Sequence, residues 1–480
     1  LASPQLARAS RWTIPASWIG AVALVGAIAT TIALLMSGRS VLLTLAYPAM
    51  AIGVSAVLVV TDPARYVALV AWLWMVSPFV RRVVDAQNGW NPQNAILLAP
   101  LLASTVGALV VMQRAGRLQR RVALPMVLAL VALAAGGAVG LTASAPSLVL
   151  YAGLSWAAPV MLGLYVAVHP EHHARMHRAL GAALLVGLTV VGVYGIFQFV
   201  QPALWDRLWM LNSRMDSIGT PQPFRVRVFS TLNAPGPLAQ FLSATVLIVL
   251  AREGARKWPA VLAGTLGLLL SLARSAWVGF AVGAIALFLM TRMRVRRGMM
   301  ALGVASAVVI ALVGTAPLPP GPDAMRQTIT RRITTMGELS MDDSFRARRY
   351  LIPAVMAQIG EHPFGSGLGA TLVGGARGAA TSRLADQGLY LDNGILEIFL
   401  VLGWFGGVLF LGSAAAALLG AFRNVRRHPV AAGYFAAALA LLTQVLGGTI
   451  FAGVGGAMFW IAIALASGAA ELQRSDGVDA

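Results

Sequence analysis

Long runs of apolar residues, separated by short polar connections, recur along almost the whole chain. A helix needs about 20 apolar residues to cross the hydrocarbon core of a bilayer. By this length the runs predict about 14 membrane spans, or about 12 or 13 if the shorter runs join. The runs are continuously apolar, whereas strands of an outer-membrane barrel alternate, so the pattern predicts helices. The approximate ranges of the runs are 13–35, 41–60, 65–80, 95–113, 122–143, 147–168, 178–200, 236–251, 258–273, 275–291, 298–315, 391–421, 430–447 and 449–470.

The composition supports the same fold class. Hydrophobic residues make up 58% of the chain and charged residues 11%, against roughly 25% charged residues in a soluble domain. Such hydrophobicity also excludes a disordered chain. The chain has no Cys, which excludes disulfides, thiolate metal sites and cysteine nucleophiles. The predicted fold is all-α, a polytopic integral membrane helix bundle of about 12–14 transmembrane helices.

The formal net charge is +19, and the basic residues stand in short clusters between apolar runs. This arrangement indicates membrane topology rather than a nucleic-acid partner. Arg8 and Arg11 precede the first run, which we interpret as a retained start-transfer helix with the N-terminus inside. By the charge rule, loops on the inner side of a membrane carry an excess of Arg and Lys. Arg81 and Arg82 are exceptions to this rule, because they fall on the outer side. The predicted inner loops carry Arg114, Arg117, Arg120, Arg121, Arg175, Arg178, Arg252, Arg256, Lys257, Arg292, Arg294, Arg296, Arg297, Arg423, Arg426 and Arg427.

Two connections, 201–235 and 316–390, are too long to be simple turns, and four spans separate them. They therefore lie on the same side, which the charge pattern makes the outer side. We expect both loops to bear short amphipathic helices and to hold the chemistry. The predicted organisation is five parts: residues 1–200 as N-terminal spans, 201–235 as the first loop, 236–315 as central spans, 316–390 as the large loop and 391–480 as C-terminal spans with a cytoplasmic tail.

Arginines are concentrated in these outer segments. Arg225 and Arg227 lie in the first loop, Arg348 and Arg349 in the second, and Arg274 at an outer helix junction. Guanidinium groups stay ionised and offer planar, bidentate donors to phosphate oxygens. The set therefore predicts a site for an anionic diphosphate at the membrane surface. The alternative is binding of lipid headgroups or pairing with local acids.

Few acid–base groups fall on the outer side. His362 lies in the second loop, and Asp392 with Asn393 opens the span that follows it. Asp392 is a candidate base, and the alternative is a helix N-cap. Glu397 lies further along the same helix, where an unpaired carboxylate is costly. We expect Glu397 to neutralise an arginine, with a role as base or at a helix interface as alternatives.

No nucleotide, hydrolase or metalloprotease motif is present. The inner segment HPEHHARMH lacks the spacing of a zinc-binding helix and is interpreted as an interfacial loop, with metal binding as the alternative. No strand is expected before the glycines of HPFGSGLG, so they are not a dinucleotide fingerprint. Gly365, Gly367 and Gly369 are expected to permit a tight turn, with proximity to a ligand left open.

Four segments resemble the O-antigen ligase/polymerase-like membrane family, which includes O-antigen ligases, Wzy-type polysaccharide polymerases, exopolysaccharide polymerases and protein O-glycosyltransferases. They are 227–236 (RVFSTLNAPG), 272–277 (LARSAW), 361–367 (EHPFGSG, with Arg348 before it) and 392–406 (DNGILEIFLVLGWFG). Their order, spacing and shared side make the set specific, and the resemblance extends over about 190–410. Ligases typically carry His where this chain has Asp392, and Asp is similar to the exopolysaccharide-polymerase branch.

The resemblance implies a glycan donor linked to undecaprenyl diphosphate at the periplasmic face of a bacterial inner membrane. An acceptor hydroxyl would displace the undecaprenyl diphosphate, in an inverting step without metal or cofactor. Arg227 and Arg274, with Arg348 in support, would bind the diphosphate. Asp392 would be the base and His362 the alternative base. Arg225 is a further diphosphate candidate, and the supporting residues are Arg349, Asn393 and Glu397.

Joining of repeat units by a polymerase is the favoured function. Transfer of the glycan to lipid A–core or to protein is the nearest alternative, and a transporter or lipid flippase is the second. The expected partners are the lipid-linked oligosaccharide donor, a glycan acceptor and membrane lipids, with no nucleic acid. A chain-length-regulating co-polymerase is left open as a further partner.

Overall fold

The structure is a computed structural model that describes residues 16–114, 116, 120–213, 215, 218–252, 254–291, 293, 295–304, 352, 353, 355–371, 393–425 and 429–468. Within these ranges every named element is a helix, and the sole β-type pairing is an isolated bridge between Gly219 and Val226. The prediction of an all-α protein is therefore confirmed.

Nine helical segments in the described ranges are long and apolar enough to cross a membrane, and three shorter apolar helices accompany them. They make this a multi-pass membrane protein, as predicted. The N-terminal helices are α1 (Ala16–Met36), α2 (Leu43–Thr61), α3 (Pro63–Asn88), α4 (Leu98–Gln113), α5 (Arg120–Ala143), α6 (Pro146–Ala167) and α7 (His173–Val200). The C-terminal helices are α9 (Pro235–Leu250), α10 (Trp258–Leu270), α11 (Arg274–Met290), α16 (Gly394–Val425), α17 (Pro429–Gln444) and α18 (Gly453–Ser467).

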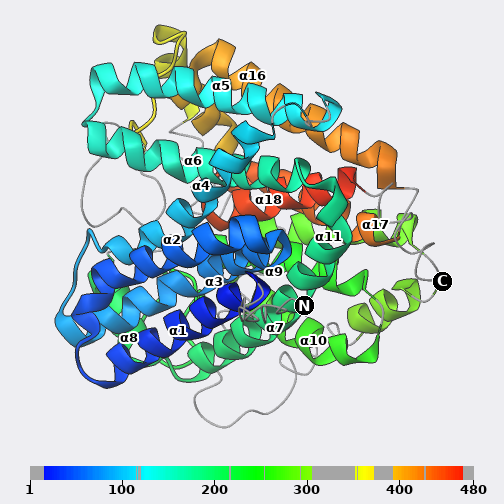
Figure 1. Cartoon of the computed structure of the whole chain (residues 1–480). Helices are drawn as coiled ribbons and strands as arrows, with labels where there is room; N and C mark the ends of the chain where they lie inside the picture. The colour runs from blue at the N-terminus through cyan, green and yellow to red at the C-terminus, as the bar shows by residue number, and fades with distance from the viewer. Residues whose placement is uncertain are drawn as a thin grey trace, which may run out of the picture.

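Helix α18 is the central element of the bundle. Nearly all of its residues are buried, and it packs against α6, α9, α16 and α17 (Figure 1). By contrast, α1 lies at the edge and exposes large apolar side chains such as Trp18 and Met36. Helices α5 and α16 lie side by side at the opposite edge (Figure 1). Exposed apolar faces of this kind suit contact with lipid tails rather than water.

Small residues set the close approach of the helices. A Cβ atom added to Gly163 of α6 would lie 2.8 Å from the Cβ atom of Trp460 in α18. A Cβ atom added to Gly192 of α7 would lie 2.5 Å from the Ala263 carbonyl carbon in α10. Helices surrounded by lipid tails have no hydrophobic driving force to associate with one another. They depend instead on close packing contacts of this kind.

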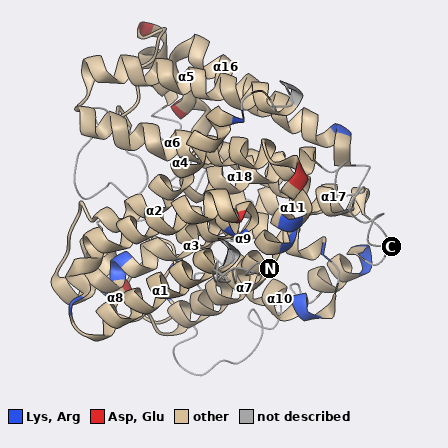
Figure 2. Ribbon diagram, viewed as in Figure 1, with Lys and Arg blue, Asp and Glu red and all other residues tan. Residues whose placement is uncertain are grey.

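Charged residues are sparse along the ribbon and lie mainly toward helix ends (Figure 2). Arg114, after α4, donates to Glu171, before α7, at 2.6 Å. Both residues belong to loops that the charge pattern assigns to the inner side. We call the opposite end of the bundle, where α3 and α7 end and α9, α11 and α18 begin, the outer end.

The first long loop contains the short helix α8 (Leu204–Asn212), in agreement with the prediction. Its Leu204 and Leu211 side chains are exposed, whereas Asp206, Trp209 and Met210 are buried. Most of the second long loop, and most of the predicted span 298–315, lie outside the described residues.

Candidate functional site at the outer end of the bundle

A buried ion pair ties the first loop to the bundle. Nη1 of Arg82 in α3 lies 2.6 Å from Oδ1 of Asp206 in α8, and neither side chain is exposed. The Tyr194 hydroxyl of α7 donates to the other Asp206 oxygen at 2.7 Å. Ions at membrane depth are costly unless they are paired. Pairing with the loop thus explains why Arg82 stands on the outer side against the charge rule.

The neighbouring Arg81 is also buried and paired. Its Nε atom donates to Asp85 Oδ2 at 3.2 Å, and the amide of Asn94 donates to the other Asp85 oxygen at 2.8 Å. The Arg81 guanidinium lies 5.2 Å from the ring centroid of Trp90 and 5.0 Å from that of Trp209. Both arginines therefore hold the first loop on the end of α3.

The same network fixes the segment 226–234, which leads into α9. The side-chain carbonyl of Gln198 accepts hydrogen bonds from the backbone N–H groups of Phe229 and Ser230, at 2.9 and 2.8 Å. Arg82 Nη2 donates to the Ser230 carbonyl oxygen. Ser230 has a left-handed φ of 50°, a conformation that costs a non-glycine residue free energy. These bonds hold the backbone in that conformation beside Arg227.

Arg227 reaches across to the turn between α10 and α11. Its Nε atom donates to the Ser271 carbonyl at 3.3 Å, and its Nη2 atom donates to the Leu272 carbonyl at 3.4 Å. Leu272 has a φ of 53°, and Arg274 begins α11 two residues later. The two arginines that the sequence proposes for a diphosphate are therefore brought to the same turn.

Four helix N-termini meet near this turn. A Cβ atom added to Gly447 would lie 2.5 Å from Oγ of Ser275 in α11. One added to Gly394, the first residue of α16, would lie 2.7 Å from the Gly448 carbonyl oxygen. Gln240 of α9 donates to the Thr449 carbonyl at 3.0 Å, shortly before α18 begins. Helix N-termini carry partial positive charge and favour anions, so this meeting point suits a negatively charged group.

Asn393 caps α16. Its side-chain oxygen accepts hydrogen bonds from the N–H groups of Ile395 and Leu396, at 3.0 and 3.2 Å. The N-cap role considered for Asp392 is thus performed by the next residue. Helix ends are often displaced by one residue from their predicted place, because neighbouring Asp and Asn residues cap equally well.

Glu397 lies in a short first segment of α16 that ends where Gly403 leaves the helical conformation, with a φ of 70°. Its carboxylate is buried and accepts a hydrogen bond from the Thr371 hydroxyl at 3.1 Å. Within the described part of the chain it forms no salt bridge, so the expected arginine partner is not found there.

The glycines of HPFGSGLG pack against helix backbones. Gly365, Gly367 and Gly369 all have left-handed φ angles, as expected of a tight turn. The Gly367 N–H donates to the Val401 carbonyl at 3.0 Å, and the Leu368 N–H donates to Gly136 of α5 at 2.9 Å. The turn therefore binds α5 and α16 together by backbone contacts that a Cβ atom would block.

His362 is exposed just before this turn, and the next residue, Pro363, accepts a hydrogen bond from the Trp404 N–H at 2.9 Å. His362 therefore lies near Trp404, and the helical segment from Gly394 to Leu402 separates Trp404 from Asn393. At 1.5 Å per residue the segment is about 13 Å long. His362 is therefore not among the residues gathered around Arg227 and Arg274.

The remaining candidates divide into two groups. Arg225 is exposed at the rim of the first loop, where its carbonyl accepts a hydrogen bond from the Thr220 N–H at 3.2 Å. Asp392, Arg348 and Arg349 lie outside the described residues. No cluster of three or more His, Asp or Glu side chains suited to a metal ion occurs in the described ranges.

Arg82, Asp206 and Gln198 were missed as site-building residues by the sequence interpretation. The available signal was the pair of arginines that violates the charge rule, together with one of the few acidic residues of the first loop. Such a charge at an apolar helix end predicts a buried partner, but it does not say which acid supplies it.

The fold and this site define a polytopic membrane protein with an arginine-lined site at one end. The family model described as O-antigen ligase (Wzy_C) matches residues 259–411, which is roughly a third of the chain. The matched region begins in α10 and includes the α10–α11 turn, the HPFGSGLG turn and the first segment of α16, and it confirms the resemblance to the O-antigen ligase/polymerase-like family. A comparison with curated proteins found no match. The family supports a ligase- or polymerase-type membrane enzyme in O-antigen or polysaccharide assembly, with lipid-linked glycans and membrane lipids as its partners.

Proposed function

We propose that the protein is a glycosyltransferase that joins oligosaccharide repeat units carried on undecaprenyl diphosphate, at the periplasmic face of a bacterial inner membrane. One observation carries the proposal. The Arg227 guanidinium lies on the turn that begins the Arg274 helix. Two guanidinium groups beside converging helix N-termini suit a diphosphate leaving group.

The diphosphate is the group on which charge develops when the glycosidic bond breaks. Donors that are already in place stabilise that charge without reorganisation, which is the main electrostatic contribution to catalysis. The 226–234 segment is held in place in this way, because its N–H groups at Phe229 and Ser230 donate to Gln198 and Arg82 donates to its Ser230 carbonyl. The buried hydroxyls of Thr231 and Thr449 have no partner among the described residues and supply further donors for phosphate or sugar oxygens.

Asp392 is our candidate for the group that acts on the acceptor, because it directly precedes Asn393 at the start of α16. As a base it would take the proton of the acceptor hydroxyl while that oxygen attacks the anomeric carbon and the bond to the diphosphate breaks. An ordinary Asp, with a pKa of about 3.9, is a weak base at neutral pH. Orientation of the acceptor hydroxyl is the second role we propose for it.

Transfer to lipid A–core or to a protein is the second candidate function, and the description of the matching family as O-antigen ligase favours it. The two functions share the donor and differ in the acceptor. Polymerisation needs only lipid-linked repeat units, whereas ligation needs a different acceptor molecule.

Reconstitution separates the two functions. The full chain in vesicles is supplied with undecaprenyl-diphosphate-linked repeat units from its host and no other acceptor, and products are sized on a gel. A ladder of longer lipid-linked glycans is the expected result. Product that forms only after lipid A–core or an acceptor protein is added would replace the polymerase proposal by the ligase. If folded protein gives product in neither reaction, both are overturned.

A further inference from the structure

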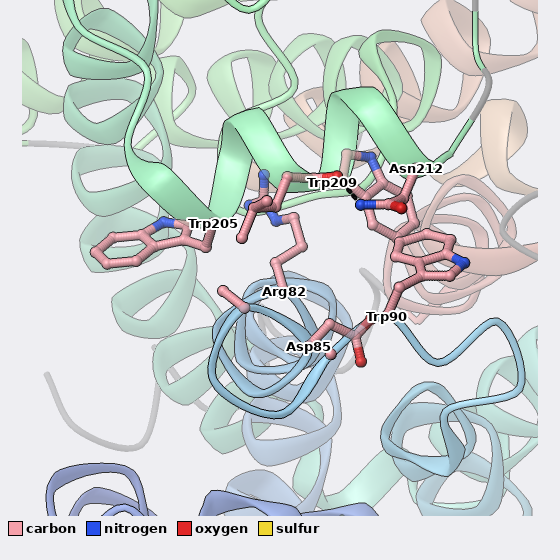
Figure 3. Close-up of a pocket in the computed structure, with 9 residues that line it drawn as sticks. Arg82, Asp85, Trp90, Trp205, Trp209 and Asn212 are labelled. Carbon is pink, nitrogen blue, oxygen red and sulfur yellow. Dashed lines mark hydrogen bonds between the residues drawn. The ribbon is translucent and has the colours of Figure 1, made fainter.

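A cavity of about 110 Å³ opens between the C-terminal end of α3 and the helix α8 (Figure 3). It lies beside the 226–234 segment, which also carries Arg227. Trp209 of its wall donates to the Asn233 carbonyl at 3.0 Å, and Arg82 donates to the Ser230 carbonyl. The cavity is thus joined to the arginine site through one short piece of backbone.

Three of the nine residues that line the cavity are tryptophans, Trp90, Trp205 and Trp209 (Figure 3). The Trp90 and Trp209 rings are 5.2 Å apart with an angle of 52° between their planes, and Arg81 lies near both. Trp205 donates to the Tyr194 hydroxyl at 2.7 Å. The rings are therefore held in place, and their fixed apolar faces need little ordering when a ligand binds.

Polar groups stand beside these rings. Arg82 is fully buried, and its Nε atom has no hydrogen-bond partner among the described residues. The Asp85 carboxylate accepts bonds from Arg81 and Asn94 and has capacity for another. Asn212 donates to the Leu208 carbonyl at 2.8 Å, which leaves its own carbonyl oxygen as a further acceptor.

This combination selects one class of ligand. A lipid tail would leave the oxygen atoms of Asp85 and Asn212 facing hydrocarbon, and a phosphate would face the Asp85 carboxylate. A sugar ring presents an apolar C–H face to indole rings and hydroxyls that both donate and accept. A cavity of roughly 150 Å³ admits benzene, so the present cavity, which is open on one side, accepts the inner part of one six-membered ring.

We propose that this cavity is a glycan subsite, which binds one sugar ring of a repeat unit at a distance from the diphosphate. The proposal rests on the proposed function, since it assumes a glycan substrate. The sugar comes either from the donor or from the acceptor chain. In both cases its binding would position the glycan without touching the reacting atoms.

Two variants test the subsite. Trp90→Ala removes one ring face, and Ala86→Phe fills the cavity from α3 without removing a native contact. The matched controls are Trp18→Ala and Val22→Phe, at exposed positions of α1. The probe is the soluble oligosaccharide released from the surface polysaccharide of the host, with binding to the full-length protein followed by saturation-transfer NMR.

We expect wild type and both controls to bind the oligosaccharide, and both cavity variants to bind it about tenfold more weakly or not at all, since loss of one well-formed contact surface is worth about 1.4 kcal/mol. In turnover, KM should rise about tenfold with little change in kcat. A rise in KM at varied donor assigns the sugar to the donor, and a rise at varied acceptor assigns it to the acceptor.

The failures are distinguishable. If wild type turns over lipid-linked repeat units but the cavity variants bind the oligosaccharide and turn over like the controls, the subsite is wrong and the proposed function stands. If the oligosaccharide binds in the cavity while no glycan is transferred to any acceptor, the function is wrong and the glycan subsite stands.

Discussion

Arg82 and Asp206, separated by 124 positions in the chain, form a 2.6 Å ion pair with no exposure of either side chain. The pair joins α3 to α8, and a second donor of Arg82 holds the backbone beside Arg227. A single arginine thus connects the stability of the outer end to the geometry of the candidate diphosphate site.

Asp206→Asn should therefore destabilise the protein strongly. It leaves the Arg82 guanidinium buried without its counter-ion, which typically costs about 3–5 kcal/mol. The measurement is the midpoint of thermal unfolding of the purified protein in detergent. Glu171→Gln, which breaks the partly exposed pair with Arg114, is the control and should cost at most about 1 kcal/mol. Equal shifts of the unfolding midpoint in the two variants would contradict the prediction that the buried Arg82–Asp206 pair contributes more stability than the partly exposed Arg114–Glu171 pair.

Arg227→Ala and Arg274→Ala should each reduce turnover by about 10²- to 10³-fold, as loss of one fixed donor to a developing oxyanion does. Both guanidinium groups are proposed to bind the same diphosphate, so their effects are coupled. The double variant should therefore lose less turnover than the product of the two single effects. The assay is the formation of the glycan ladder in vesicles. Arg207→Ala, at an exposed arginine of α8 that donates to the Pro202 carbonyl, provides the control. Near-normal turnover of folded Arg274→Ala would refute its role.

Asp392→Asn and Asp392→Glu separate the two roles proposed for this residue. If Asp392 is the base, the Asn variant loses most of its turnover, typically about 10²- to 10⁴-fold, and the Glu variant keeps part of it with an altered pH profile. If it orients the acceptor, Asn retains the polar contact and the main effect falls on the KM of the acceptor. Near-normal kcat and KM in a folded Asn variant would exclude both.

Gly140→Ala should destabilise the contact of α5 with the HPFGSGLG turn, because the new Cβ atom would collide with the backbone at Leu368. Overpacking of this kind costs about 1–3 kcal/mol. Gly137→Ala, one turn earlier in α5, places its Cβ atom 3.7 Å from a Leu368 methyl group and should be neutral or slightly stabilising. Thermal unfolding of the two variants gives the comparison, and equal midpoints would show that the turn yields to the added methyl group.

Treatment with EDTA should leave turnover unchanged if guanidinium groups alone stabilise the leaving diphosphate. The ladder assay is run with chelator and again after addition of Mg²⁺ or Mn²⁺. Loss of product with EDTA and recovery with either ion would replace the arginine mechanism by one that needs a metal.

The helical spans could be predicted because each depends on a local property, an apolar stretch long enough for a bilayer. Thirteen of the predicted runs contain a helix named above, including the short α9, α10 and α18. The same local pattern cannot show that α16 divides at Gly403, because the positive φ there depends on the backbone of the Pro363–Gly365 turn packed against it. Glu397 consequently lies in a short segment with Thr371 as its partner.

The site was predicted in part. Arg227 and Arg274 were singled out because guanidinium groups at apolar boundaries are costly and suit phosphate, and the fold brings them to one turn. His362 was grouped with them because it lies in an outer loop, but a shared side of the membrane does not imply proximity. The N-cap of α16 fell on Asn393 instead of Asp392, a one-residue choice between equally good caps.

The sequence by itself determined the fold class, the run of spans and the arginine-rich character of one end, because hydropathy and charge act over single segments and need no knowledge of neighbours. The tertiary structure alone decided which residues meet: Arg82 with Asp206, Arg227 with the Ser271–Leu272 turn, and the three tryptophans around one cavity. Such pairings arise from the packing of helices far apart in the chain, where a buried charge or donor must find its partner in three dimensions.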